Sequence, residues 1–345
     1  MILKGTDVGN GMKIAVLMGG KSFEREFSLA SGKQICAALE EAGHKVVPLD
    51  TTEALVPTLR SERPDVAFIC LHGKHGEDGT IQSLLEFVGL PYVGSSAHTC
   101  RSTWNKDSLH TTMAAYRAAT GDEPIAYWPQ GICIARDAFK SMGAATALDL
   151  VAERVIGGYP VAVKPAHGGS ALGVHRVDAQ ENLGRAILDA LSYDDHVVIE
   201  QWIEGVEMAV SILGSGWDAY ALPPVEIVPK QGFFDTAARM DASLVDYYTP
   251  VRPASLSPDA AQAEAIRAEI ERAALEVYRA YDMRDLGRID LIWDGAQARV
   301  METAVVPGMT ATSLFPQACI AAGLTRAGVA DALVRAAFDR GPVQW

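Results

Sequence analysis

The sequence lacks the features of a membrane protein and of a nucleic-acid-binding protein. No run of apolar residues approaches the roughly 18 that a membrane-spanning helix needs. Acidic residues (43) outnumber basic ones (30), giving a formal net charge of −13, so there is little of the positive charge that nucleic-acid binding requires. We therefore expect no membrane and no nucleic-acid partner. A local group of lysines or a helix N-terminus could still bind a small anion.

The sequence also lacks any cysteine pattern typical of a metal site or a disulfide framework. Its five cysteines are scattered, and most, such as Cys70 and Cys133, stand among apolar neighbours. They are typical of small buried side chains in a reducing compartment. The first eleven residues contain Lys4, Asp7 and three glycines, unlike a signal peptide, and we expect residues 1–11 to be disordered. The predicted location is cytoplasmic.

What the chain does contain is enough apolar sequence for two or three domains, since 49% of its 345 residues are hydrophobic. In the first third, strand-like segments at 13–18, 45–49 and 65–71 alternate with helical patterns. This alternation predicts βαβ units with a parallel sheet. Ligands bind at the carboxyl ends of such strands, which here carry Gly19-Gly20 and the segment 72–79.

Two carboxylates near the C-terminus are the most informative feature. Segments 288–293 and 298–302 alternate polar and apolar residues around a glycine turn, which predicts a β-hairpin. Asp290 and Glu302 then lie almost opposite each other. Arg288 lies on the same face and is the one counter-charge that the hairpin provides. At ~5 Å the two carboxylates would repel by roughly 3 kcal/mol at an effective dielectric of about 20. Magnesium between them would remove the repulsion; two solvated acids on an edge hairpin explain the residues equally well.

A glycine-rich loop, 165–173, follows the predicted strand 161–164. Backbone amides without Cβ obstruction can wrap a polyphosphate, and Lys164 at the end of the strand could neutralise phosphate charge. No Lys-Ser/Thr pair follows the last glycine, so this is not a P-loop, and a flexible hairpin tip is the other interpretation.

A predicted strand at 196–200 ends in Glu200, and the apolar Trp202-Ile203 and then Glu207 follow. Hydrogen-bond acceptors beside an aromatic wall are what a nucleotide needs, although an ordinary amphipathic edge has the same composition. Lys106 alone is indistinguishable from a surface lysine.

The segment 307–314 is a glycine-hinged turn with several hydroxyl donors. Such a turn can hold a carboxylate through backbone N–H groups and hydroxyls. The same residues are typical of a helix start, with Thr310 or Thr312 as the N-cap of the apolar run to Ala322. Both interpretations can hold together.

Together these segments resemble the D-alanine–D-alanine ligases of the ATP-grasp superfamily, from about Lys13 to Leu324. The resemblance rests on six ordered segments: 19–29, 71–80, 163–165, 169–170, 287–290 and 307–310. It implies an α/β fold, α+β in the C-terminal half, with an ATP-grasp fold preceded by a Rossmann-like N-terminal domain with a parallel sheet. The implied domains are a substrate domain at 1–105, a central ATP-grasp subdomain at 106–206, and a C-terminal ATP-grasp domain at 207–345 with the magnesium and second-substrate sites.

The resemblance also implies an activity: ATP-dependent joining of two D-alanines through an acylphosphate, for peptidoglycan precursors. Magnesium would be the cofactor, with manganese able to replace it, and ATP and D-alanine the small-molecule substrates of a protein that is commonly a homodimer. The implied residues are Glu24, Ser170, Arg288 and Gly308 in catalysis; His72, Ser313 and Leu314 at the substrates; Lys106, Lys164, Gly169, Glu200, Gln201, Trp202, Ile203 and Glu207 at ATP; and Asp290 and Glu302 at magnesium.

Three departures from the family pattern motivate alternatives. Ala304 stands where an asparagine ligand is usual, so one of two magnesium ions should bind more weakly. Met240 stands at a tyrosine position of the expected lid, 230–250, and His167-Gly168 replaces Arg-Glu in the loop over the phosphates. The apolar Met240 suggests D-lactate or D-serine as the second substrate. Ala304 suggests a weakly active paralogue that binds nucleotide or D-amino acid.

Overall fold

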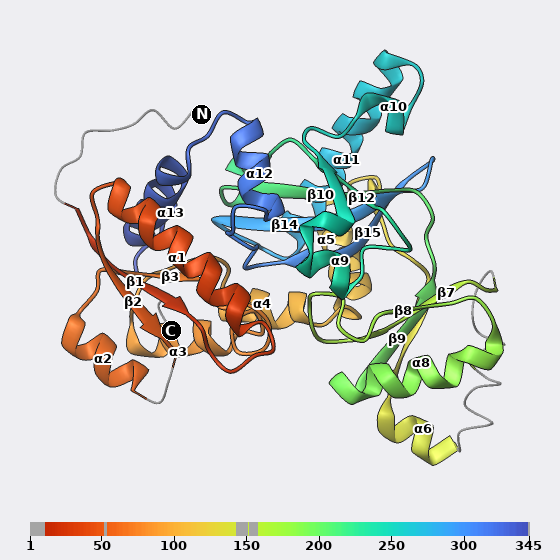
Figure 1. The fold of residues 1–345 in the computed structure, drawn as a ribbon, viewed down its shortest axis with the longest axis horizontal. Helices are drawn as coiled ribbons and strands as arrows, with labels where there is room; N and C mark the ends of the chain where they lie inside the picture. Colours follow the sequence, from red (N-terminus) through yellow and green to blue (C-terminus); the bar gives the residue numbers. More distant parts are fainter. Residues whose placement is uncertain (1–10, 52–53, 143–150, 152–157, 344–345) are drawn as a thin grey trace.

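The computed structural model describes residues 11–51, 54–142, 151 and 158–343 of the 345. The side chains of Met142, Met240 and Ala242 lie outside this description, as does nearly all of the segment 1–11 that we expected to be disordered. Three sheets organise the described chain (Figure 1).

The N-terminal sheet is parallel throughout, with strand order β2-β1-β3-β4, as the alternating pattern predicts. Its strands are β1 (Lys13–Met18), β2 (Lys45–Asp50), β3 (Val66–Ile69) and β4 (Tyr92–Val93), and the intervening helices are α1 (Arg25–Glu41), α2 (Leu55–Glu62) and α3 (Thr80–Val88). Strands β1 and β3 are mostly apolar and buried, as expected inside a covered parallel sheet, whereas the edge strand β2 is partly exposed. The segments after β1 and β3 therefore emerge together at one edge.

A second sheet, also of four strands and called the small sheet below, is antiparallel, in the order β6-β9-β7-β8. It contains β6 (Gly131–Ala135), β7 (Val161–Pro165), β8 (His175–Val177) and β9 (His196–Gln201), together with helices α6 (Arg136–Met142) and α8 (Gln180–Tyr193). In Figure 1 it forms the lobe at the lower right, with α6 and α8 beside it. The glycine-rich loop links β7 to β8 along one side of this lobe.

The third sheet has seven strands, in the order β13-β12-β10-β14-β15-β5, with β11 paired to β10. Its strands are β5 (Ala126–Tyr127), β10 (Val206–Leu213), β11 (Tyr220–Ala221), β12 (Val225–Pro229), β13 (Val245–Tyr248), β14 (Leu286–Trp293) and β15 (Ala298–Ala304). All of its pairs are antiparallel except β15 with β5. Thus β5 extends a sheet whose other strands all come from residues 206–304.

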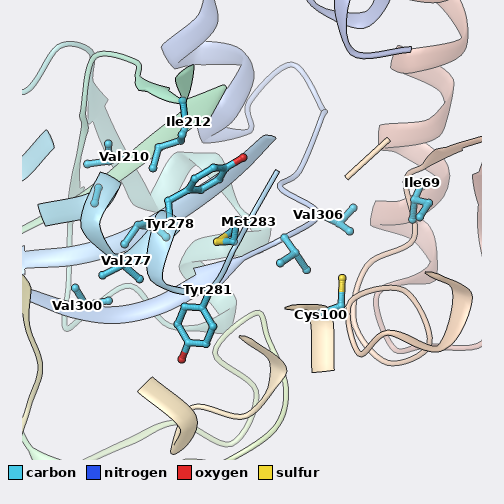
Figure 2. Packing of buried hydrophobic residues seen from close by; sticks show 14 of the residues in the cluster. Ile69, Cys100, Val210, Ile212, Val277, Tyr278, Tyr281, Met283, Val300 and Val306 are labelled. Atoms are coloured by element: carbon cyan, nitrogen blue, oxygen red, sulfur yellow. The ribbon is translucent and has the colours of Figure 1, made fainter. Parts of the chain in front are cut away.

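The described chain has seven further α-helices: α4 (Ala97–Trp104), α5 (Ser108–Thr120), α9 (Thr236–Met240), α10 (Pro253–Leu256), the long α11 (Ala260–Ala280), α12 (Leu314–Ala321) and α13 (Arg326–Arg340). Helix α11 begins where Asp259 accepts a hydrogen bond from the Gln262 amide, a favourable N-cap. Val277 and Tyr278 of α11 pack with Val210 and Ile212 of β10 in the core shown in Figure 2. Neither α11 nor any other helix of the described residues is long and apolar enough to cross a membrane.

Candidate active site

The hairpin that the sequence predicts is β14–β15, and its register confirms that Asp290 lies opposite Glu302. Near the turn, Leu291 pairs with Val300, but the next pair is Asp290 with Glu302, so Met301 is an extra residue on its strand. A β-bulge of this kind lets two consecutive residues face the same side of a sheet. Without it, Met301 would sit opposite Asp290 and Glu302 would turn toward the core. The bulge therefore creates the carboxylate pair.

More positive charge surrounds this pair than the sequence predicted. Arg288 donates two hydrogen bonds to Asp290, at 2.6 and 2.9 Å. Lys106 Nζ lies 3.6 Å and an Arg239 nitrogen 4.0 Å from the Glu302 carboxylate. The prediction of one counter-charge was wrong, because Lys106 and Arg239 come from elements that the hairpin pattern cannot reveal. Both distances to Glu302 exceed those of ordinary hydrogen bonds, so its oxygens keep the capacity to bind a metal ion.

A cavity of about 510 Å³ opens between the small sheet and the large one. Its volume suits a nucleotide-sized ligand. Trp202, Ile203 and Phe233 provide apolar walls, and the Trp202 and Phe233 rings meet edge to face with centroids 5.2 Å apart. Of the expected ATP-binding residues, seven line this cavity: Lys106, Lys164, Gly169, Glu200, Trp202, Ile203 and Glu207. Gln201 does not line it; its side-chain oxygen faces the Gln130 amide instead.

The charged groups of this cavity are buried and coupled. Lys164 Nζ lies 2.6 Å from a Glu200 oxygen, and both side chains are only 9% exposed. Burial, and then the neighbouring Lys164, lower the pKa of Lys106, although Glu302 opposes them. Lys106 also donates a hydrogen bond to the Gly168 carbonyl of the glycine-rich loop. Burial raises the pKa of Glu207 to about 7, so near neutral pH part of its population is protonated and can donate as well as accept hydrogen bonds.

A second cavity, of about 500 Å³, lies beside the first and is rich in carboxylates. Its walls include Glu24, which immediately precedes α1, and Glu77, from the loop after β3. Ser170 of the glycine-rich loop donates a hydrogen bond to Glu24 Oε1, and its backbone is held at a positive φ of 52°. Few residues other than glycine adopt this conformation, so the loop places Ser170 at some conformational cost.

His72 lies in the wall of the second cavity but is buried, at 4% exposure. One ring nitrogen is 2.9 Å from the Ser31 hydroxyl and the other 3.1 Å from the Val306 carbonyl. Burial lowers its pKa to about 4, so the ring is neutral at physiological pH. A neutral, doubly hydrogen-bonded ring can shape a subsite and orient groups, but it adds no positive charge.

Glu77 is a residue to which the sequence assigned no role, although it lies in the segment 71–80 on which the resemblance rests. Its carboxylate accepts a hydrogen bond from the Gly73 amide at 3.2 Å and lies 3.7 Å from His72. Burial raises its pKa to about 8. Burial and then the Glu77 carboxylate raise the pKa of Glu24. Two neighbouring acids with raised pKa values indicate an environment that favours an incoming cation.

The turn after β15 closes the other side of the second cavity. Ser313, Leu314 and Gly308 all line it. A Cβ at Gly308 would lie 2.6 Å from the Phe27 ring and 2.7 Å from the Ser313 hydroxyl, so a larger residue there would force both side chains to move. The Ser313 hydroxyl accepts a hydrogen bond from the Thr310 amide, and Ser313, not Thr310 or Thr312, occupies the N-cap position of α12. That detail of the N-cap prediction was wrong.

The expected lid, 230–250, has regular structure where it is described. It contains α9 and the edge strand β13, which pairs with β12. Thr236 donates a hydrogen bond to the Ser170 carbonyl at 3.0 Å, and Phe234 and Arg239 line both cavities. The segment thus lies across the junction of the two cavities. The Met240 side chain, on which the second-substrate alternative rests, is outside the described part of the chain.

Comparisons with known proteins place this geometry in a family. The family models described as D-ala D-ala ligase C-terminus and D-ala D-ala ligase N-terminus match residues 134–335 and 56–95. A D-alanine–D-alanine ligase of Desulforudis audaxviator is 36% identical over 329 residues, which cover 95% of this chain and 99% of that protein.

Solved structures show the same relationship in three dimensions. The D-alanine–D-alanine ligase of Bacillus anthracis complexed with ATP superposes with a TM-score of 0.72 at 26% identity, covering 96% of this chain and 98% of that one. The VanG D-Ala:D-Ser ligase of Enterococcus faecalis shares the fold, with a TM-score of 0.75 at 24% identity, and covers 95% and 100% of the two chains. On this evidence, the chain belongs to the D-alanine–D-alanine ligase family and has its ATP-grasp fold.

Proposed function

We propose that this protein joins two D-alanines in an ATP-dependent reaction through an acylphosphate, supplying a peptidoglycan precursor. The observation that carries the proposal is the junction of the two cavities. A cavity with lysines and an aromatic wall adjoins one with buried carboxylates, and Lys106, Arg239 and Glu302 line both. A phosphoryl donor and a carboxylate acceptor would therefore meet at the groups that stabilise transferred phosphate.

In the first cavity, Trp202 and Ile203 would cover the adenine, and Glu200 and Glu207 would form hydrogen bonds with its polar atoms. Lys106, Lys164 and the amides around Gly169 would hold the phosphates. The buried contact of Lys164 with Glu200, which restrains the lysine in the cavity wall, supports this role. The B. anthracis relative with the same fold is described in complex with ATP.

Asp290 and Glu302 would hold the magnesium ion. The donor set fits, because two carboxylates face each other in a cavity wall and hard oxygen ligands are what magnesium prefers. Manganese accepts the same ligands. When bound, the ion supplies charge neutralisation for the phosphates and the transferring phosphoryl group.

In the second cavity, Glu24 would bind the ammonium group of the first D-alanine, with Ser170 fixing the carboxylate and neutral His72 shaping the subsite. Ser313 and Leu314 would receive the carboxylate of the second D-alanine at the start of α12, where backbone N–H groups favour an anion. Arg288 and the Gly308 amide would face the developing oxyanion. The segment 230–250, in which Thr236 is hydrogen-bonded to the Ser170 carbonyl, would exclude water from the acylphosphate.

Each part of the chain would then have its own function. Residues 1–105 would carry the first-substrate site, 106–206 the nucleotide-binding sheet, and 207–345 the magnesium and second-substrate sites. The cytoplasmic location and the homodimer stay predictions.

The deciding experiment supplies the protein with ATP, magnesium and D-alanine, with and without D-lactate or D-serine, and measures phosphate release and products. We expect D-alanyl-D-alanine over many turnovers. A preference for D-lactate or D-serine as second substrate near neutral pH would contradict the proposed substrate. ATP binding without phosphate release for any D-amino acid would contradict catalysis and favour a binding paralogue.

A further inference from the structure

A second group of metal-binding side chains lies outside the hairpin, on the small sheet. His167, Asp194 and His196 each offer one ligand atom, and these atoms all lie within 4.8 Å of one another. They come from the start of the glycine-rich loop, the C-cap of α8 and the first residue of β9. These elements lie side by side in the lobe at the lower right of Figure 1. The proposed ligase chemistry uses none of the three.

The backbone holds all three residues before any ligand arrives. The Ala166 amide donates to the His196 carbonyl at 3.0 Å, and the Lys106 amide donates to the Ala166 carbonyl at 2.9 Å. Asp194 accepts hydrogen bonds from both the backbone amide and the ring Nδ1 of His167, each at 2.9 Å. His167 and Asp194 are thus already ordered, so their side chains would lose little entropy on binding a metal ion.

His196 is the ligand that is free to adjust. Its side chain is exposed, and among the described residues its ring nitrogens have no hydrogen-bond partner; the ring only meets that of His167 edge to face, at 6.1 Å between centroids. Tetrahedral zinc, with bonds of about 2.0–2.2 Å, needs ligand atoms ~3.3 Å apart. His167 Nδ1 and Asp194 Oδ2 are 2.9 Å apart, so a small separation of these two atoms and a rotation of the exposed His196 ring would complete the set.

We propose that His167, Asp194 and His196 form a binding site for one transition-metal dication, such as zinc, separate from the magnesium site. Two imidazoles and one carboxylate favour zinc, cobalt or nickel, whereas magnesium prefers oxygen ligands. With three protein ligands, the remaining coordination positions would be filled by water from the exposed side. The ion would replace the hydrogen bond between His167 and Asp194.

Occupation of this site would restrain the glycine-rich loop. His167 directly precedes Gly168, whose carbonyl accepts the hydrogen bond from Lys106, and both residues line the first cavity. A metal ion that joins His167 to the start of β9 would therefore fix the loop at its entry. Backbone opening around 166–170 should become rarer, which hydrogen exchange detects.

Cobalt(II) is the direct probe, because its visible absorption reports imidazole coordination. Titration of the nucleotide-free protein, with excess magnesium to occupy the Asp290–Glu302 carboxylates, should show one saturable site, and zinc should displace the cobalt. His196→Ala should weaken cobalt binding at least 10-fold, since an exposed ligand is removed without disturbing the core. The matched control is His175→Ala, because His175 also hydrogen-bonds to an aspartate, Asp189, at 2.7 Å but has no third ligand beside it among the residues that the structure describes. This control should bind cobalt like the parent.

Hydrogen–deuterium exchange supplies the second measurement. Zinc should slow exchange at least several-fold in peptides covering 163–173 of the parent and the control, but not of His196→Ala. Unchanged cobalt affinity in His196→Ala, or loss of binding in His175→Ala, would overturn the site. Cobalt binding without any change in exchange would overturn the restraint on the loop. None of these measurements requires ligase activity, so they stand apart from the proposed function.

Discussion

The two cavities that meet at Glu302 differ in the charged side chains that line them. The first offers Lys106, Lys164 and Arg239, with Glu200 already paired to a lysine. The second offers Glu24 and Glu77, whose pKa values are raised by burial and which have no lysine or arginine hydrogen-bonded to them in the described structure. The cavities share Lys106, Arg239 and Glu302, so the difference lies in Lys164, which lines only the first, and in Glu24 and Glu77, which line only the second.

This difference in charge explains how one active site can bind two small amino acids and a nucleotide at different positions. A polyphosphate placed in the second cavity would meet buried carboxylates, and an ammonium group placed in the first would meet lysines. Wrong placement of charge costs several kcal/mol in a desolvated site, on the order of what specificity requires. At the hairpin, Arg288 donates hydrogen bonds to Asp290, and Glu302 lies opposite Asp290, so both signs of charge meet where the two cavities join.

The largest effect should come from breaking the junction itself. Glu302→Gln keeps the shape of the side chain but removes its charge from both cavities and from the expected magnesium site. We expect kcat/KM to fall about 10³-fold or more, because the charge is needed in the transition state. Steady-state phosphate release measures this. Glu204→Gln is the control: this acid also lines the first cavity but is 72% exposed and bonded to Arg176. Comparable losses in both variants would contradict the role of Glu302.

The next prediction tests the first cavity, which is lined by lysines. Lys164→Met leaves Glu200 buried without its partner, which should cost about 3–5 kcal/mol of stability and raise the KM for ATP roughly 10–100-fold. Adding Glu200→Gln should restore most of the melting temperature without restoring ATP affinity. If the double variant recovered ATP affinity as well, Lys164 would act only through folding.

The sequence revealed the hairpin pair better than it revealed what surrounds it. Alternation and a glycine turn are local signals, and they led to Asp290 opposite Glu302. The bulge at Met301 was not foreseen, because an extra residue changes which side chains share a face without changing composition. Arg239 and Glu77 were missed for another reason. They reach the site from segments far away in sequence, and no periodicity records such contacts.

The parallel N-terminal sheet was predicted correctly because its strands are short apolar runs between helices. Strand β5 was not foreseen, since two residues, Ala126 and Tyr127, form it and so short a segment has no pattern. Gln201 shows the limit of the resemblance. The family position predicts an ATP contact, yet the side chain of Gln201 turns toward the Gln130 amide at the end of β9.

A smaller effect is expected in the second cavity, which is lined by carboxylates, and it can be tested by varying the pH. Because burial raises the pKa of Glu24, its carboxyl becomes protonated at a higher pH than an ordinary glutamate does. An ammonium ligand needs the ionised form, so the KM of the first D-alanine should rise as pH falls toward that raised pKa. Glu24→Gln should raise this KM about 10-fold and flatten its dependence on pH. A parent enzyme whose first-subsite KM is constant from pH 9 to pH 5 would contradict the role of Glu24.

The smallest effect concerns the position two residues beyond Glu302. Ala304 pairs with Arg288 in the hairpin and lines the second cavity, but it offers no side-chain oxygen to a metal ion. Ala304→Asn would add a carbonyl ligand on the face of Glu302, so the rate at limiting magnesium should rise about 2–5-fold while the rate at saturating magnesium stays unchanged. Ala304→Leu has a similar volume without the oxygen, and the rate should not rise at any magnesium concentration. A gain shared by both variants would mean that packing against Arg288 limits the reaction, whereas a loss specific to asparagine would show that the hairpin has adapted to fewer ligands.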